Sequence, residues 1–252
     1  MSRTQLEHHW HPSPNIGPRR GLELPELLIL HYTGMETARA ACFWLCNPAS
    51  GVSCHYLVDE KGSITQMVDE SQRAWHAGVS RWKSCDDINS ASIGIEIHNP
   101  GHDLGYLDFP AAQIESVIGL CTDIIARNGI AAENVLAHSD IAPLRKRDPG
   151  EKFPWATLHE AGIGHWVTPF PPDAGKGLKT GDHGAAVGAL VRNLCAYGYP
   201  LAPADVFDST VAAVVTAFQR HFRPSRVDGI ADHSTLETLT RLLSALPARE
   251  PS

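Results

Sequence analysis

Two histidines and one aspartate, far apart in the sequence, could together bind a metal ion. His31 and His138 each follow a short apolar run, and Asp148 lies in the segment after His138. Two imidazoles and one carboxylate form a ligand set that suits Zn2+, and three protein ligands leave a fourth position for water. Sites of that kind are catalytic rather than structural. We therefore expect His31, His138 and Asp148 to be the ligands of a catalytic zinc ion.

Two further residues could complete the chemistry. Zinc lowers the pKa of a water in its fourth position from ~16 to about 7. Glu96 could accept the proton of that water and return it to a leaving nitrogen. Lys146 could stabilise the negative charge that grows on a carbonyl oxygen. Any one of these side chains is more often an ordinary structural residue, but their combination predicts an amide-bond hydrolase.

Hydrophobic patterns predict the strands that position these groups. Residues 27–30 form a continuous apolar run that reads as a buried strand ending at His31, and residues 134–137 do the same for His138. Residues 92–98 alternate, so the three isoleucines share one face and Glu96 lies on the other. Ligands at the ends of neighbouring strands are typical of open α/β sheets.

The remaining pattern before residue 170 is mixed α/β. Residues 55–59 and 63–68 predict a hairpin with Gly62 in its turn, and residues 35–45 look helical. Pro110 opens the clearest helix, which ends at Gly129.

A proline- and glycine-rich stretch at residues 169–177 predicts a linker. After it, residues 187–194, 211–222 and 236–246 form three amphipathic segments that predict helices. We expect a catalytic domain over residues 1–172, a linker over 173–177 and a three-helix domain over 178–252.

Composition excludes some classes of function. A formal net charge of −7 argues against nucleic acid as a partner. No apolar stretch reaches the ~20 residues that a membrane span needs. The N-terminus lacks the apolar core of a secretory signal, so we expect a cytoplasmic protein. Nothing in the sequence indicates an oligomer, and we expect a monomer.

The cysteines and the N-terminal histidines, which lie outside the candidate zinc site, are predicted to have no catalytic or metal-binding role. The six cysteines contain no Cys-x-x-Cys pair, and we expect buried, reduced thiols, although Cys42 and Cys46 lie one helical turn apart. The spacing of His8, His9 and His11 would allow them to bind a metal, but we expect this segment to be a flexible, solvated tail.

Six segments in the first part resemble the type 2 N-acetylmuramoyl-L-alanine amidases, over about residues 24–170. They are LHYT (30–33), SCHYLV (53–58), WHAG (75–78), SIGIE (92–96), AHSDIAP (137–143) and RKRDPG (145–150). The resemblance implies a central mixed β-sheet flanked by helices. It also implies Zn2+ on His31, His138 and Asp148, Glu96 as the acid/base and Lys146 as its assistant. The reaction would cut the amide between N-acetylmuramic acid and L-alanine in peptidoglycan or muropeptides.

The same resemblance suggests a substrate groove. Its candidate residues are Tyr32, Trp75, His76, Arg81 and Asn89. Tryptophan faces suit sugar rings, and an arginine could pair with a stem-peptide carboxylate. Trp75 could equally be an ordinary core or rim residue.

Two positions next to this site carry separate expectations. We expect His55 to pack or form hydrogen bonds beneath the site rather than bind the metal. Related phage enzymes carry a tyrosine where this chain has Cys54, which favours Glu96 as the proton carrier.

The second part resembles a peptidoglycan-binding type 1 domain, a three-helix module. The matching segments are LKTGD (178–182), FDST (207–210), FQRHF (218–222) and VDGIADHST (227–235). Such a module would hold the enzyme on intact wall, which favours periplasmic action despite the missing signal. Removing residues after about 175 should then spare hydrolysis of small muropeptides.

Two other functions compete with the amidase. Relatives of this fold include recognition proteins that only hold muropeptides, but these have no need of a full metal site. A zinc endopeptidase would share the chemistry without this order of motifs, and its products would be cut stem peptides.

Overall fold

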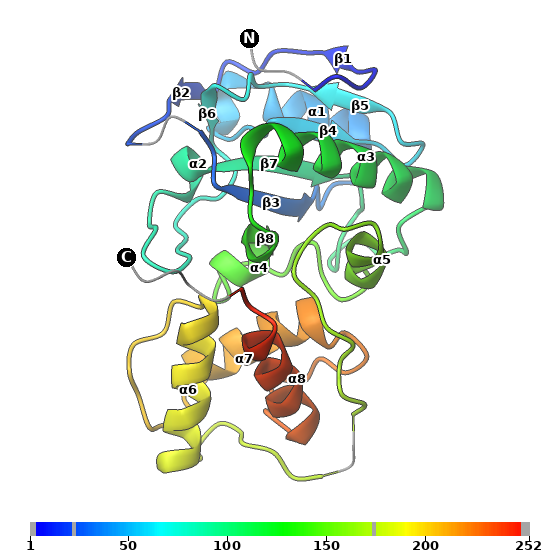
Figure 1. Ribbon diagram of the computed structural model, residues 1–252. Helices are drawn as coiled ribbons and strands as arrows, with labels where there is room; N and C mark the ends of the chain where they lie inside the picture. Colours follow the sequence, from blue (N-terminus) through cyan, green and yellow to red (C-terminus); the bar gives the residue numbers. More distant parts are fainter. Residues whose placement is uncertain (1–3, 22–23, 173–174, 248–252) are drawn as a thin grey trace.

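A mixed six-stranded sheet forms the centre of the first part of the chain (Figure 1). The computed structural model describes residues 4–21, 24–172 and 175–247. The strand order is β1-β5-β4-β7-β3-β8, and β2 pairs with β6 in a separate two-stranded sheet. The strands are β1 (His9–Trp10), β2 (Ile16–Pro18), β3 (Leu27–Tyr32), β4 (Tyr56–Val58), β5 (Ile64–Gln66), β6 (Gln72–Ala74), β7 (Ser92–Ile97) and β8 (Val135–Ala137).

Helices flank this sheet and form most of the second part. They are α1 (Ala38–Leu45), α2 (Ile88–Ala91), α3 (Ala111–Asn128), α4 (His138–Ile141), α5 (Trp155–Glu160), α6 (Ala185–Tyr197), α7 (Ser209–Phe222) and α8 (His233–Ser244). The mixed sheet with flanking helices and a C-terminal helical part confirms the predicted fold. No helix among the described residues is both long and apolar enough to cross a membrane.

Strand alternation explains which face of the sheet each helix covers. Leu28 and Leu30 of β3 and the three isoleucines of β7 point to one face, where α3 and α5 bury them. The α3 helix begins after Pro110 and ends at Gly129, as its sequence predicted. Gly129 has a φ of 68°, a left-handed conformation that glycine adopts without strain. The opposite face of the same strands is free to carry His31 and Glu96.

One local prediction needs refinement. His138 follows β8 as expected, but residues 138–141 form the short helix α4 rather than the beginning of a loop. The Asp140 side chain accepts a hydrogen bond from the Ala137 backbone at 2.8 Å, which caps this turn. The direction of the His138 side chain therefore depends on how Asp140 is held.

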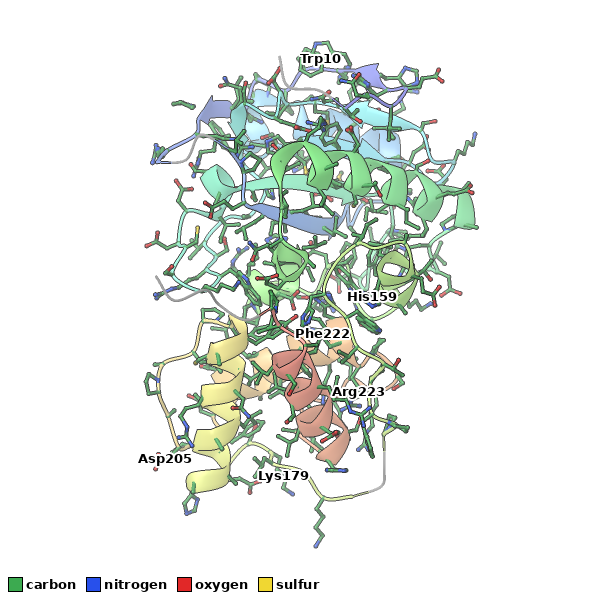
Figure 2. The ribbon with its side chains drawn as sticks, viewed as in Figure 1. Trp10, His159, Lys179, Asp205, Phe222 and Arg223 are labelled. Carbon is green, nitrogen blue, oxygen red and sulfur yellow. The ribbon has the colours of Figure 1, made fainter. Side chains whose placement is uncertain are left out.

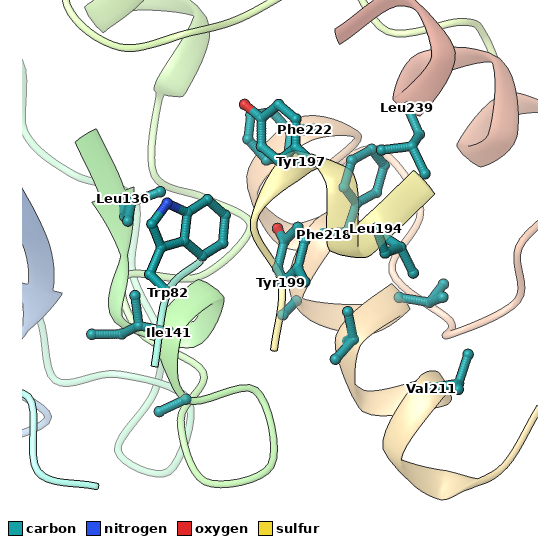
Figure 3. Close-up of a cluster of buried hydrophobic side chains, with 14 of the residues drawn as sticks. Trp82, Leu136, Ile141, Leu194, Tyr197, Tyr199, Val211, Phe218, Phe222 and Leu239 are labelled. Atoms are coloured by element: carbon teal, nitrogen blue, oxygen red, sulfur yellow. The ribbon is translucent and has the colours of Figure 1, made fainter. Parts of the chain in front are cut away.

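The two parts of the chain share a hydrophobic core. Leu27 and Ile29 of β3, together with Trp82, belong to the same buried cluster as the apolar faces of α6, α7 and α8. Trp82 is 1% exposed and makes edge-to-face contacts with Tyr197 and Tyr199 (Figure 3). Phe222 also lies at this boundary between the sheet and the C-terminal helices (Figure 2).

Buried polar contacts cross the same boundary. Tyr199 donates a hydrogen bond to Asp140 at 2.7 Å, and His221 Nδ1 lies 2.6 Å from the other oxygen of that carboxylate. Because Asp140 caps the turn that carries His138, residues of the C-terminal part support a candidate metal ligand. Of the proposed linker, residues 173–174 lie outside the described residues. Nearby, Phe170 donates its backbone N–H to Thr238 of α8.

Candidate active site

Three neighbouring parallel strands deliver the candidate catalytic groups to one place. In the register of β3 and β7, His31 stands directly beside Glu96. On the other side of β3, β8 ends at Ala137, so His138 follows at the same edge of the sheet. Asp148 returns to this edge and accepts the Ser139 backbone N–H on its own carbonyl at 3.0 Å.

The side chains of His31, His138 and Asp148 converge on one point. Their ligand atoms all lie within 4.8 Å of one another, and all three residues are buried. Asp148 Oδ2 lies 3.2 Å from His31 Nδ1 and 2.9 Å from His138 Nδ1. The two Nδ1 atoms are 2.8 Å apart. Two nitrogens and one carboxylate oxygen brought this close fit Zn2+, with a fourth position left open.

The protonation states of His31 and Asp148 also suit metal binding. Burial is the main cause that lowers the pKa of His31 to about 4, so its imidazole is neutral and keeps a lone pair. The pKa of Asp148 lies well below its usual range. Burial alone would raise it, but the neighbouring His138 and His31 imidazoles lower it by more. A neutral imidazole and an ionised carboxylate are the forms that bind a metal.

A chain of hydrogen bonds fixes the tautomer of His31. Ser92 Oγ donates to the Ile88 carbonyl at 2.6 Å, so it accepts the Nε2 proton of His76 at 3.1 Å. His76 Nδ1 is then an acceptor for His31 Nε2–H at 2.9 Å. The remaining nitrogen of His31, Nδ1, is the one that faces His138 and Asp148.

The His138 ring is oriented by a backbone carbonyl. His138 Nε2 lies 3.1 Å from the Ala77 carbonyl oxygen, to which it can only donate, and this leaves Nδ1 for a metal. Asn89 Oδ1 accepts the backbone N–H groups of His76 and Ala77 at 3.0 and 2.8 Å. Asn89 therefore holds the segment that orients both candidate histidine ligands.

Gly94 makes this arrangement sterically feasible. A Cβ atom at this position in β7 would lie 2.6 Å from His76 Nδ1, far inside van der Waals contact. The missing side chain lets the His76 ring lie against the sheet directly behind His31. His55 forms hydrogen bonds beneath the site, as predicted: it accepts the Gly94 N–H on Nδ1 at 3.0 Å.

Substitution of His76 tests the tautomer chain. His76→Phe keeps a ring but removes the acceptor for His31 Nε2–H, so we expect metal affinity to fall about 10–100-fold. Competition with a chromophoric zinc chelator measures the change. His98→Phe, a half-buried histidine just beyond β7, is the matched control and should leave affinity unaltered. Equal affinities for the wild type and His76→Phe would contradict the chain.

Glu96 is poised beside the ligand set with an unused oxygen. Its Oε2 atom is buried and has no hydrogen-bond partner among the described residues. Burial raises the pKa of Glu96 well above its usual value, the Asp148 charge raises it further, and Lys146 lowers it. A bound cation would also lower it. A carboxyl group whose pKa is subject to these opposing influences is suited to accept a proton and return it during a reaction.

A cavity of about 370 Å³ opens beside this cluster. Its walls include Tyr32, Trp75 and His76 of the predicted substrate groove, together with Glu96 and Lys146. The volume is within the range of small-molecule binding sites.

Two predicted groove residues are not among the lining residues of this cavity. Arg81 is exposed, with its Nε atom 3.4 Å from the Lys83 carbonyl oxygen. Asn89 is buried, and its Oδ1 atom accepts the two backbone N–H groups described above. His76 lines the cavity, but both of its ring nitrogens are already engaged. Hence the contacts of Asn89 and His76 give both residues a positioning role toward other groups of the site.

Sequence reasoning missed the contribution of α1 to this cavity. Ala41, Trp44 and Leu45 line it, and the Trp44 side chain is about half exposed. An exposed aromatic residue on a short amphipathic helix after His31 was the available signal. Trp44 and Trp75 thus both border the cavity.

Comparisons with known proteins agree with this geometry. The N-acetylmuramoyl-L-alanine amidase family matches residues 21–151, and a putative peptidoglycan binding domain matches residues 183–239. AmiD from Escherichia coli strain K12 is 39% identical over 238 residues, which are 86% of this chain and 82% of AmiD. The 1,6-anhydro-N-acetylmuramyl-L-alanine amidase AmpD from the same organism is 36% identical over 162 residues, 58% of this chain and 86% of AmpD.

Solved structures give the same result. The complex of E. coli AmiD with anhydro-N-acetylmuramic acid-L-Ala-D-gamma-Glu-L-Lys has a TM-score of 0.75 at 36% identity and covers 90% of this chain and 92% of its own. AmpDh3 from Pseudomonas aeruginosa in complex with an anhydromuramic pentapeptide has a TM-score of 0.75 at 35% identity. It covers 89% of this chain and 93% of its own.

Proposed function

Because this chain belongs to the N-acetylmuramoyl-L-alanine amidase family, we propose that it is a zinc-dependent hydrolase of muropeptides. It cuts the amide between N-acetylmuramic acid and L-alanine in peptidoglycan or its fragments. The observation that carries the proposal is the convergence of His31, His138 and Asp148 beside Glu96 at a cavity. Substrate complexes of AmiD and AmpDh3, which share the fold, support the substrate class.

His31, His138 and Asp148 would hold the zinc ion. When bound, zinc supplies a water of lowered pKa and polarises the substrate carbonyl. Glu96 accepts the proton of the attacking water and delivers it to the L-alanine nitrogen as the amide bond breaks. His76 and Ala77 keep both imidazoles in the tautomer that leaves Nδ1 free.

Lys146 stabilises the negative charge that develops on the carbonyl oxygen. Its backbone N–H donates to the Ala142 carbonyl at 3.0 Å, and the residue lines the same cavity as Glu96. Its charge lowers the pKa of both His31 and Glu96, which places it within electrostatic reach of the reacting groups.

Lys146→Ala should lower kcat by about 10²–10³-fold with a smaller change in KM, because the lysine acts mainly in the transition state. Steady-state kinetics on a soluble muropeptide measure both constants. Lys152→Ala, on an exposed lysine outside the cavity, is the control. A rise in KM at constant kcat would refute the oxyanion role.

The second part of the chain would bind peptidoglycan. The match of residues 183–239 to a putative peptidoglycan binding domain supports this assignment. We keep residues 1–172 as the proposed catalytic domain and 178–252 as the proposed binding domain, although the two share a core. Tyr32 and Trp75, which line the cavity, are the proposed substrate contacts.

Product analysis tests the proposed reaction. A muropeptide of defined stem is incubated with the purified full chain, and the products are identified by mass spectrometry. The amidase releases the whole stem peptide with a free amine on L-alanine. Cut stems would instead identify an endopeptidase, and unchanged muropeptide that still binds would identify a recognition protein.

A further inference from the structure

A second cluster of metal-ligating side chains lies outside the catalytic cavity. We propose that His11, Cys42 and Cys46 bind a thiophilic metal ion of the zinc class and so tie the N-terminal segment to α1. The candidate ligand atoms of these three residues all lie within 4.8 Å of one another. The sequence predicted a solvated tail for His11 and buried, reduced thiols for the two cysteines. The fold brings the three residues together.

The fold holds each ligand in place by contacts of its own. His11 follows β1, and its backbone N–H donates to the Gln66 carbonyl at 3.0 Å at the edge of the main sheet. Cys42 lies in α1 and Cys46 is the C-cap of that helix, so their side chains share one helical face. Cys46 Sγ lies 3.5 Å from the His11 carbonyl oxygen, which joins the two segments directly.

The Cys42 and Cys46 thiols are partly buried, unlike a pair of thiols on the open surface. Cys42 and Cys46 are half-buried and pack against the small hydrophobic cluster of Leu45, Leu57 and Met67. The His11 side chain is exposed, so an ion could enter from the solvent side. Both β1 and α1 lie at the end of the molecule opposite the C-terminal helices (Figure 1).

The donor set specifies the chemical class of the ion. Two sulfurs and one imidazole nitrogen favour Zn2+, Co2+ or Cd2+ and disfavour Mg2+ and Ca2+, which require oxygen ligands. Three protein ligands leave a fourth position for water or a further donor. The catalytic cluster has only nitrogen and oxygen donors, so the two sites differ spectroscopically.

The position of the site indicates its effect. Ala41, Trp44 and Leu45 of the same helix line the catalytic cavity. An ion bound to Cys42 and Cys46 would therefore fix one wall of that cavity against the sheet edge. This structural role is separate from the chemistry of hydrolysis. If the second metal site does not exist, the proposed amidase function still stands.

Cobalt titration of the reduced, metal-free full chain tests the proposal. Thiolate-to-cobalt charge transfer absorbs in the near ultraviolet, and only a site with sulfur ligands produces it. We expect this absorption to saturate in the wild type and to be displaced by added Zn2+. Cys42→Ser and Cys46→Ser should lose it, whereas Cys85→Ser, on a half-buried cysteine elsewhere, should retain it.

Histidine substitutions provide the second arm. His11→Ala alters an exposed residue and should weaken or abolish the absorption, while His9→Ala in the same segment should not. The proposal is overturned if the reduced wild type shows no thiolate absorption, or if His9→Ala and His11→Ala behave alike. Intact-mass evidence of a Cys42–Cys46 disulfide that persists after reduction would also overturn it.

Discussion

Glu96→Gln should lose hydrolysis by about 10²–10⁴-fold and keep its metal, because the amide cannot accept or return a proton. Gln has nearly the same shape as Glu, so packing in β7 should be preserved. Turnover of a soluble muropeptide, zinc content and thermal unfolding are measured on the same preparation.

The control for this substitution is Glu115→Gln, on an exposed glutamate of α3 far from the cavity. It should retain wild-type turnover. Near-wild-type activity of Glu96→Gln, with zinc still bound, would remove Glu96 from the proposed mechanism and leave the proton transfer without a carrier.

Deletion of residues 176–252 should unfold the remaining chain. The shortened chain should therefore hydrolyse neither small muropeptides nor intact wall. The deletion exposes Leu27, Ile29, Trp82, Leu136 and Ile141, which share one core with the C-terminal helices. Burial of a large apolar side chain contributes about 1.5–3 kcal/mol. Five such losses are comparable to the whole stability of a domain, about 5–15 kcal/mol.

This expectation is opposite to the one drawn from the resemblance to a wall-binding module, which predicted that small muropeptides would still be hydrolysed. Thermal unfolding and turnover of a soluble muropeptide by the shortened chain decide between them. An unchanged Tm with full turnover would show that the C-terminal part is only a tethered wall-binding module.

A point substitution probes the same junction in the full chain. A Cβ atom on Gly198 would lie 2.6 Å from the Trp82 ring. Gly198→Ala should therefore lower the Tm by several degrees more than Gly181→Ala. Gly181 also has a positive φ, of 97°, but has no atom within 4 Å of its added Cβ. Equal decreases in Tm would mean that backbone strain alone destabilises both variants, and that the contact with the Trp82 ring contributes nothing further.

Local patterns predicted most of the fold and the strand ends that bring His31 and His138 together. Alternation in residues 92–98 placed Glu96 opposite the isoleucine face, and the β3–β7 register puts it beside His31. Apolar runs ending at His31 and His138 identified the strand ends that meet at one edge of the sheet. Periodicity is a property of each segment alone, so it can be read without knowing the neighbours of that segment.

Contacts between segments were harder to predict. His76 and Asn89 were predicted as substrate-groove residues from their position in the chain, which did not indicate their hydrogen bonds to His31 and to the backbone. Nothing in the sequence around His11 indicates that it meets Cys42. These relations depend on tertiary packing, which no local pattern encodes.

The shared core of the two parts is a further example. The proline- and glycine-rich stretch has the composition of a flexible connector, and each flanking part has its own hydrophobic pattern. Trp82 carries no signal that its ring is buried against Tyr197 and Tyr199. An amphipathic face predicts that a partner surface exists, but it does not identify that surface.

Hydrolysis of one muropeptide by chelator-treated and zinc-reconstituted protein tests the central proposal most directly. Zinc content of the wild type and of His138→Ala is measured in parallel. We predict that the chelated protein is inactive and that zinc restores release of the whole stem peptide. His138→Ala should contain one zinc ion fewer and stay inactive. Full hydrolysis by metal-free protein, or zinc-loaded wild type without hydrolysis, would contradict a zinc amidase.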